Sequence, residues 1–399
     1  MDEAIIKDKI VRTVDEKSEE LWQAALTIHS NPELGHQEHE AAKLLSGMLE
    51  SAGFDVDRKV AGMETSFVAE RSFGQGDGFT VAILAEYDAL PGMGHACGHN
   101  LIGTASVGAG LAVLEVVEEL AEAGFSGRLL VMGAPAEEGA VDNAGGKVLM
   151  VQEGLFEDVD CALMVHPSST NGIGGRSLAR EAMEITYHGK SSHAAASPEK
   201  GRNALDAAIQ TFNGWNALRQ HVTDDVRIHG IITEGGQSPN IVPDLARIRM
   251  YARAADVDYL DEVVNRIKDC AEGGARAAGC TVEFRRTANR YANMKPNLTL
   301  AGAYADNFRR LGEDIDETLR GGGSTDMGDV SHEVPSIHPY VAIVPPSVAG
   351  HSTEFAEAAG SDPGKRGMLL AAKAMAMTVV DCFTDENLQK EMKAEFKRT

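Results

Sequence analysis

Apolar residues recur at helical spacing between residues 4 and 52. An apolar side chain at every third or fourth position marks one face of a helix. The clearest stripe consists of Ala41, Leu44, Leu45, Met48 and Leu49. Gly53 follows it and is typical of a helix end, because glycine readily takes the left-handed conformation found there. We therefore expect the chain to open with helices that each pack one apolar face.

Short apolar runs then alternate with longer helical segments. The runs 79–85, 129–134 and 161–165 have the length and composition of buried strands. Residues 101–120 are rich in alanine, glycine, leucine and valine, which predicts a helix packed closely beneath a sheet, and a second helix is predicted over 146–152. This alternation predicts an α/β domain.

The pattern of predicted strands and helices changes after a glycine-rich stretch at 172–177. It predicts strand, helix, strand, strand, helix and strand, an order typical of a sheet covered on one face by two helices. We therefore predict an inserted α+β (βαββαβ) domain at 179–294, within a discontinuous domain formed by 1–178 and 295–399. The predicted elements of the insert are a strand at 182–187, a helix from Asn203, strands at 228–233 and 246–252, a helix at 257–278 and a strand at 281–285.

The composition narrows the class of protein. The chain has 399 residues, 43% of them hydrophobic, which suits two domains with cores of their own. Its formal net charge of −23 argues against nucleic acid or an anionic membrane as a partner, since both favour basic surfaces. The five cysteines are odd in number and widely spread, so we expect the reducing cytoplasm rather than a disulfide framework. No signal-peptide pattern and no run of about 18 apolar residues is visible, so we expect no membrane span.

Candidate metal ligands follow three of the predicted strands. Cys97 and His99 lie in a glycine-containing loop after the first strand, and a thiolate and an imidazole at this spacing can bind one divalent ion. Glu137 and Glu138 follow the second strand, and His166 follows the third. The carboxyl ends of strands in an open α/β sheet form ligand crevices, so the pattern favours a metallohydrolase. Taken alone, the Cys-x-His pair is equally compatible with a packed thiol beside a surface histidine.

Eight short motifs follow one another along the chain. They are HSNPELG with QEHE at 29–40, EYDALP with GHACGHN at 86–100, PAEEG at 135–139, HP at 166–167, SHA with GRNAL at 192–205, NIVP at 240–243, STD at 324–326 and HSTE at 351–354. In order and residue type they resemble the M20 metallopeptidase and amidohydrolase family, in its branch of aminoacylase-like and aminobenzoyl-glutamate hydrolase-like enzymes. The resemblance implies a zinc-peptidase-like catalytic domain with a mixed sheet and helices on both faces. It also implies that the inserted domain serves as a lid and in dimerisation.

The resemblance further implies a two-metal site. Five side chains match the family's ligand positions and are expected to bind two divalent ions: Cys97, His99, Glu138, His166 and His351. One thiolate and three imidazoles favour zinc, although manganese, cobalt or nickel also occupy mixed sites.

Five more residues receive roles around this site, those of His193 and Asn240 from the resemblance. Glu137 is expected to act as general base toward a water between the ions. His193 is expected to stabilise the oxyanion from the inserted domain of a second subunit, which implies a homodimer. Asn240 and Thr325 are expected to contact a small amide substrate, and Asp88 to orient a metal-binding histidine through a hydrogen bond. A turn-forming role for Asn240 and a solvated loop position for Asp88 are the alternatives.

Two positions depart from the family pattern. Glu86 stands where relatives have histidine or aspartate, so we expect it to make no metal bond and His99 to take that role. Asn100 stands where most aminoacylase-like members have an acid, which questions a simple transfer of their substrates. The forms at 86–88 and 324–329 are closer to enzymes acting on aminobenzoyl-glutamate and on dipeptides such as β-alanyl-lysine. We therefore expect metal-dependent hydrolysis of an amide bond in a small N-acyl amino acid or dipeptide.

Two other functions stay open on the sequence. Cys97 could be the nucleophile of a cysteine hydrolase with His99 as its base. That reading leaves Glu138, His166 and His351 without a role, and it predicts resistance to chelators. Alternatively, the chain could be a non-catalytic or partner-dependent subunit, because a fold does not fix a function.

Overall fold

The computed structural model describes residues 2–76, 78–139, 141–319 and 321–398. The chain divides into two compact units. Unit 1 comprises Met1–Arg176, Met294–Gly322 and Asp326–Thr399, and unit 2 comprises Ser177–Asn293 and Gly323–Thr325. The sequence predicts the insert at 179–294 and assigns Thr325 to the larger domain. Thr325 instead clusters with unit 2.

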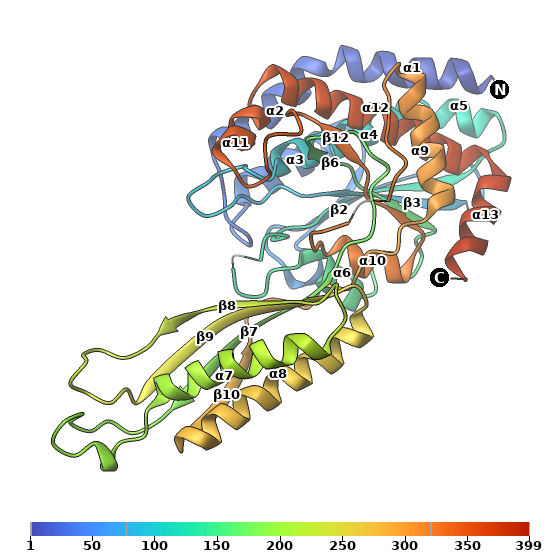
Figure 1. The fold of residues 1–399 in the computed structure, drawn as a ribbon. Helices are drawn as coiled ribbons and strands as arrows, with labels where there is room; N and C mark the ends of the chain where they lie inside the picture. Colours follow the sequence, from blue (N-terminus) through green and yellow to red (C-terminus); the bar gives the residue numbers. More distant parts are fainter. Residues whose placement is uncertain (1, 77, 140, 320, 399) are drawn as a thin grey trace. The chain divides into compact units, whose positions relative to one another are not determined.

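Unit 1 is built on a six-stranded mixed sheet. Its strands are β1 Asp55–Arg58, β2 Phe67–Phe73, β3 Phe79–Ala85, β4 Gly127–Gly133, β5 Cys161–Leu163 and β11 Ser336–Ile337. They lie in the order β1-β2-β4-β3-β5-β11 (Figure 1). β3 is parallel to β4 and β5, β11 is parallel to β5, and β1 and β2 form the antiparallel edge. A separate parallel pair consists of β6 His166–Ser168 and β12 Tyr340–Ala342.

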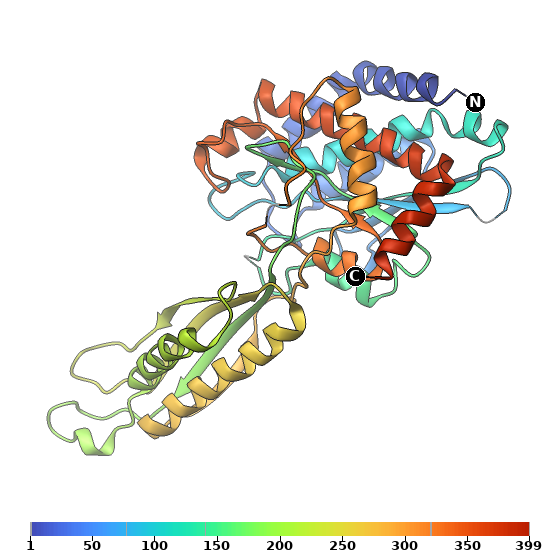
Figure 2. The ribbon, with the colours of Figure 1, turned by 45° about the vertical axis from the view of Figure 1, so that its right-hand side comes forward.

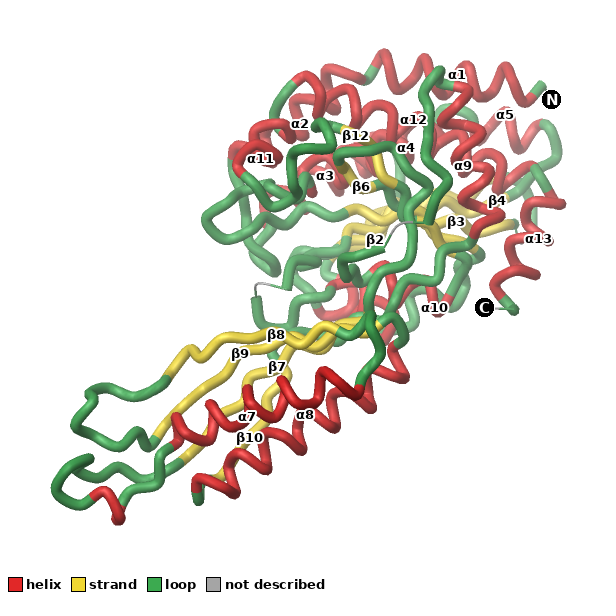
Figure 3. Tube along the Cα trace, in the orientation of Figure 1, coloured by secondary structure: helices red, strands yellow, loops and turns green. Residues whose placement is uncertain are grey.

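Helices cover both faces of this sheet, as predicted. They are α1 Glu3–Glu16, α2 Ser18–Ser30, α3 His39–Ala52, α4 His99–Leu114, α5 Val117–Glu122, α6 Gly146–Gln152, α9 Leu298–Arg310, α10 Met327–Glu333, α11 Thr353–Ala359, α12 Asp362–Thr384 and α13 Glu386–Phe396, with a short 3-10 turn at Val60–Gly62. Val81 and Ile83 of β3 join the large core with α1 to α4, α9 and α12. Ala82 and Leu84 join a smaller core with α6 and α10 on the opposite face. Figure 3 shows the helices on either side of the strands, as a strand buried on both faces requires.

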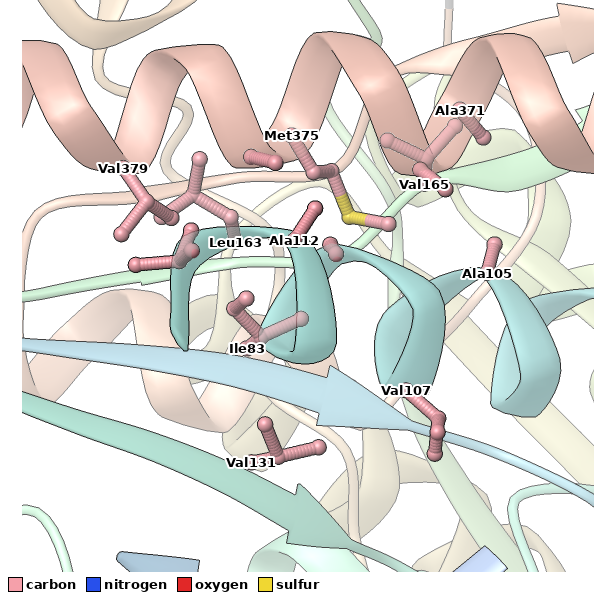
Figure 4. Close-up of a cluster of buried hydrophobic side chains, with 14 of the residues drawn as sticks. Ile83, Ala105, Val107, Ala112, Val131, Leu163, Val165, Ala371, Met375 and Val379 are labelled. Carbon is pink, nitrogen blue, oxygen red and sulfur yellow. The ribbon is translucent and has the colours of Figure 1, made fainter. Parts of the chain in front are cut away.

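The helices α4 and α12 pack against each other at the centre of unit 1. Figure 4 shows Met375 of α12 and Ala112 of α4 in the apolar cluster that also contains Ile83 and Val131 of the sheet. By length and composition α12 could cross a membrane, but 78% of its most apolar window is buried inside the structure, as in a core helix.

The predicted helix at 101–120 is wrong in one respect. α4 ends at Leu114 and α5 begins at Val117. Between them Val116 has φ −116° and a fully buried side chain. The N–H of Val116 donates a 3.0 Å hydrogen bond to the carbonyl of Val113, three residues back, so the helix closes in a tighter turn here.

Unit 2 contains the predicted sequence of strands and helices. Its elements are β7 Ala179–His188, α7 Ala204–Leu218, β8 Arg227–Glu234, β9 Leu245–Ala254, α8 Val257–Ala278 and β10 Thr281–Arg286, with 3-10 turns at Pro198–Lys200 and Arg219–His221. The antiparallel sheet has the order β10-β7-β9-β8, and Figure 2 shows α7 and α8 on one of its faces. Asn203 and Asp256 cap the two helices, since each side chain accepts hydrogen bonds from backbone N–H groups of the first turn.

Candidate metal centre

The five predicted ligands come from loops and element ends of unit 1. Cys97 precedes α4, and His99 is the first residue of that helix. Glu138 follows β4, His166 begins β6, and His351 precedes α11. Because β3, β4 and β5 are parallel, the segments that follow them meet at one edge of the sheet. Side chains distant in sequence are thereby brought together.

Cys97 lies at the centre of this cluster. Its Sγ is 3.4 Å from Nε2 of His166 and 3.3 Å from Nε2 of His351. Nε2 of His351 is in turn 3.4 Å from Oε1 of Glu138. Ligand atoms of Cys97, His99 and His166 all lie within 4.8 Å of one another, and so do those of Cys97, Glu138 and His351.

Asp88 fixes the direction of His99. Its Oδ1 is 2.8 Å from Nδ1 of His99, and its Oδ2 accepts a 3.0 Å hydrogen bond from the backbone N–H of Glu138. Nε2 of His99 is consequently turned toward the cluster. Nδ1 of His166 lies 2.6 Å from the carbonyl of Pro167, which leaves its Nε2 facing Cys97. A hydrogen bond on one ring nitrogen of this kind orients metal-binding histidines.

The donor atoms fit a metal ion. Among the described residues, Nε2 of His99 and Oε1 of Glu138 are buried and make no well-aligned hydrogen bond, although Nε2 of His351 lies 3.4 Å from that oxygen. Such atoms are rare in folded proteins, and a cation would satisfy both. Burial lowers the pKa of His166 to about 4, which favours the neutral imidazole that binds metals. Burial raises the pKa of the Cys97 thiol well above its ordinary value.

Glu137 lies beside the cluster. Its carboxylate forms one group with His99 and Glu138, and a second group with Glu86 and Asp326, each within 4.8 Å. Burial, with the charges of Glu86 and Glu138, raises the pKa of Glu137 well above its ordinary value.

Lys147 is a charged residue of the site that the sequence did not reveal. Its ammonium donates hydrogen bonds to Glu86 and, at 2.6 Å, to Oδ1 of Asp326, and all three side chains are buried. Burial disfavours its charge, but Asp326 and Glu86 outweigh burial and raise the pKa of Lys147. Oε2 of Glu86 is 3.5 Å from Nε2 of His99. A lone lysine at the start of the apolar helix 146–152 was the signal available in the sequence.

Asn100, which departs from the family pattern, binds two neighbouring helices. Its amide donates hydrogen bonds to the carbonyls of Ala25 and Ala359, at 3.3 and 3.0 Å. The side chain therefore ties α4 to α2 and α11. Both partners are acceptors, so an acid at this position could not replace the amide donor.

Three predicted residues belong to unit 2. His193 and Asn240 lie on adjacent segments, since the N–H of Ala194 donates to the carbonyl of Asn240 at 3.0 Å. Nδ1 of His193 accepts hydrogen bonds from the N–H groups of Ala195 and Ala196, at 3.2 and 3.1 Å. The remaining hydrogen of the neutral ring is then on Nε2, which makes Nε2 a donor. Oδ1 of Asn240 accepts a 2.6 Å hydrogen bond from the Ser238 hydroxyl.

Thr325 lies next to a contact between two segments of unit 2. The neighbouring Ser324 hydroxyl accepts a 3.1 Å hydrogen bond from Arg253 of β9. This bond holds the segment Gly323–Thr325 against the small unit with which it clusters.

Comparison with known proteins identifies the family. The model of Peptidase family M20/M25/M40 matches residues 82–361, well over half of the chain. The chain belongs to this family. This chain is 38% identical to the Xaa-Arg dipeptidase of Mus musculus, over 98% of this chain and 92% of that protein. It is 32% identical to a p-aminobenzoyl-glutamate hydrolase subunit from Escherichia coli, over 93% and 90%. These relatives are hydrolases, and the M20 protein is an enzyme of the same class.

Solved structures show the same fold. An aminobenzoyl-glutamate utilization protein from Klebsiella pneumoniae matches with a TM-score of 0.72 at 19% identity, over 93% of this chain and 98% of that one. A dinuclear metal-binding peptidase of the M20 family from Bacillus subtilis matches with a TM-score of 0.66 at 21% identity, over 92% and 99%. The candidate ligand groups of the M20 protein thus occur in a fold that is known to hold a dinuclear centre.

Proposed function

We propose that this enzyme hydrolyses the amide bond of a dipeptide or small N-acyl amino acid, with Glu137 as general base. The observation that carries the proposal is the convergence of a thiol, three imidazoles and a carboxylate, with Nε2 of His99 and Oε1 of Glu138 both buried. In this arrangement Glu137 takes a proton from the attacking water and delivers it to the leaving nitrogen.

The ligand set would hold two divalent ions, and zinc suits it best. Cys97, His99, Glu138, His166 and His351 supply sulfur, nitrogen and oxygen donors, a mixture that zinc prefers and that manganese, cobalt or nickel can also occupy. When bound, the ions would supply Lewis-acid activation of the water and of the amide carbonyl. Asp88 keeps His99 in the tautomer that presents Nε2 to the cluster.

Replacement of the general base tests the chemistry. Glu137→Gln is expected to lower kcat on the order of 10²- to 10⁴-fold while the bound metal stays in place. The measurement combines steady-state kinetics with metal analysis of the purified variant. A variant with full activity would contradict the role of Glu137.

For the substrate we propose a dipeptide with a basic carboxyl-terminal residue. The mouse relative is named for dipeptides that end in arginine, and its 38% identity over nearly the full chain exceeds the 32% of the aminobenzoyl-glutamate hydrolase relative. The test is a mass-spectrometric screen of Xaa-Arg and Xaa-Lys dipeptides, N-acyl amino acids and aminobenzoyl-glutamate, with added zinc or manganese and again with chelator. Cleavage of aminobenzoyl-glutamate alone would overturn the dipeptide assignment.

We further propose that the active enzyme is a homodimer joined through the inserted domain, in which His193 of one subunit serves the metal centre of the other. The donor on Nε2 of His193 suits the oxyanion that forms during amide hydrolysis. Coexpression of His193→Ala and Glu137→Gln chains with different tags tests this. Each homodimer should be inactive, whereas the mixed dimer contains one intact site and should regain activity. A mixed dimer without activity would contradict the shared site.

The two alternatives make different predictions. A cysteine hydrolase with Cys97 as nucleophile would need no metal ion. Cleavage that resists chelators would establish it. The second alternative is a partner-dependent subunit, and the Escherichia coli relative is itself named as a subunit of a hydrolase. If the chain is a non-catalytic subunit, it should be inactive alone, and Glu137→Gln should leave the activity of the complex unchanged.

A further inference from the structure

The loop that carries Glu137 and Glu138 contains a residue in a strained conformation. Ala136 has φ 57°, in the left-handed region that alanine rarely adopts. Its side chain is fully buried, and its carbonyl accepts a 2.6 Å hydrogen bond from the N–H of Gly145. Gly35 packs so closely that a Cβ there would lie 2.8 Å from Cβ of Ala136. The surrounding structure must therefore hold this turn.

Glu38 holds the other polar group of Ala136. The carboxylate is fully buried, and its Oε1 accepts a 2.8 Å hydrogen bond from the N–H of Ala136. Its Oε2 accepts a 2.8 Å hydrogen bond from the hydroxyl of Thr65. Glu38 belongs to the opening motif at 29–40, which contains none of the five candidate metal ligands. A fully buried carboxylate is normally paired with a cation. It is unusual for one to accept hydrogen bonds from a backbone N–H and a hydroxyl instead.

A second buried carboxylate acts on the same loop. Oδ2 of Asp88 accepts a 3.0 Å hydrogen bond from the N–H of Glu138. The N–H groups before and after Glu137 are thus each held by a carboxylate. Because the backbone direction determines where a side chain points, the two bonds together fix the direction of the Glu137 side chain.

We propose that Glu38 is a positioning residue for the hydrolysis. By binding the N–H of Ala136 it keeps the left-handed turn in place, and the turn aims Glu137 at the cluster of ligands. The inference rests on the proposed role of Glu137 as general base. Glu38 touches neither the ligands nor the substrate in this scheme, and its effect passes through the loop.

Three substitutions at Glu38 test the proposal. Glu38→Ala removes both acceptors and should lower kcat on the order of 10- to 100-fold at unchanged KM and metal content, because small misplacements of a catalytic group have effects of this size. Glu38→Gln keeps an oxygen for Ala136 and a polar group for Thr65, so kcat should stay within about threefold of the wild type. Glu38→Asp keeps the charge but shortens the reach and should fall between them. It also serves if the alanine variant does not fold.

Glu33→Ala is the matched control. Glu33 belongs to the same motif, and its carboxylate likewise accepts two backbone N–H groups, those of Glu40 and Ala41 at the start of α3. Its loss should lower stability without changing kcat. Hydrogen exchange of the peptide that contains Ala136, followed by mass spectrometry, gives a readout independent of activity. Exchange should accelerate in Glu38→Ala and stay unchanged in Glu33→Ala.

A second-site change separates positioning from mere stability. Glycine adopts positive φ without steric strain. Ala136→Gly in the Glu38→Ala background should therefore recover part of the lost kcat, although glycine adds no stabilising contact. A stability defect alone would not be repaired in this way.

The outcomes are distinct. A wild-type enzyme that cleaves no amide in the screen refutes the proposed function itself. If the wild type is active, the inference is overturned by Glu38→Ala with wild-type kcat, by equal kcat losses in Glu38→Ala and Glu33→Ala, or by a double variant that recovers nothing. A kcat loss restricted to Glu38→Ala, with faster exchange and partial recovery by Ala136→Gly, supports it.

Discussion

At the scale of single residues, the site is held by buried charges that have specific partners. Lys147 lies between Glu86 and Asp326, and Asp88 joins His99 to the backbone of Glu138. Removing one partner of such a group leaves an uncompensated buried charge, which is far more destabilising than losing a surface ion pair.

Lys147→Met is expected to lower the free energy of unfolding by about 3 to 5 kcal/mol, because two carboxylates would stay buried without their cation. Lys390→Met is the control. Lys390 pairs with Glu386 on an exposed helix face, where such a pair contributes at most about 1 kcal/mol. Urea unfolding of both variants measures the difference. Equal unfolding free energies for the two variants would contradict the role assigned to the buried cation.

The pH dependence of stability follows from Glu38. Burial, assisted by the charge of Asp88, raises the pKa of Glu38 to about 7 from an unfolded value of 4.5. Between these values the folded protein holds more protons than the unfolded chain, so stability falls as pH rises through this window. Glu38→Gln cannot ionise. Its stability relative to the wild type should increase between pH 5 and pH 8, by up to about 3 kcal/mol. Denaturant unfolding at both pH values checks this, and a constant difference would refute it.

At the scale of elements, close packing of α4 places the first ligands. Glycines let this helix approach its neighbours: a Cβ at Gly110 would lie 2.6 Å from Cγ2 of Val131, and one at Gly108 would lie 2.9 Å from Cδ1 of Leu21. Since His99 begins α4, the depth of the helix in the core also sets the position of this imidazole. The apolar composition predicted the burial of the helix and suggested the close contacts.

Gly110→Ala is expected to destabilise the protein by about 1 to 3 kcal/mol, because the added methyl group overpacks the contact with Val131. Gly47→Ala in α3 is the matched substitution. A Cβ at Gly47 meets nothing within 4 Å, so the better helix propensity of alanine should stabilise the protein by about 0.5 to 1 kcal/mol. Thermal unfolding of both variants is the measurement. Shifts of the same sign would contradict the packing argument.

At the scale of the whole molecule, the candidate ligands connect distant parts of the chain. They extend from Cys97 to His351, and the loops that carry them follow strands or precede helices of unit 1. A metal bound to all of them favours the folded state, since the unfolded chain offers no preformed site.

Metal removal should therefore lower the Tm. At a metal concentration about 100 times the Kd, the gain in unfolding free energy is about 2.7 kcal/mol. Differential scanning fluorimetry with added zinc and with chelator measures the shift. His351→Ala should reduce it, whereas His188→Ala, on the exposed end of β7, should leave it unchanged. A wild-type Tm that ignores both zinc and chelator would refute the metal site.

The pattern of apolar and polar residues predicted most helices and strands, because their formation depends largely on residues close in sequence. β3, α6 and α8 have the predicted bounds, and Asn203 caps α7 where the helix was expected to start. The break after Leu114 was missed, because the apolar periodicity continues through it while the backbone closes in a turn at Val116. The site residues divide in the same way: short motifs predicted the ligand candidates, whereas the distant partners of buried residues could not be predicted from local pattern.

The sequence by itself determined which residue types stand at the strand ends, and hence the ligand candidates, since periodicity, caps and short motifs act over a few residues. The tertiary structure decided the partners. Glu38 meets Ala136 across 98 positions, and Lys147 meets Asp326 across 179. Asn100 stands inside the most suggestive motif, yet it turns to the carbonyls of Ala25 and Ala359. The direction of a side chain and its distant partners depend on how packed elements place their backbones, which no local pattern records.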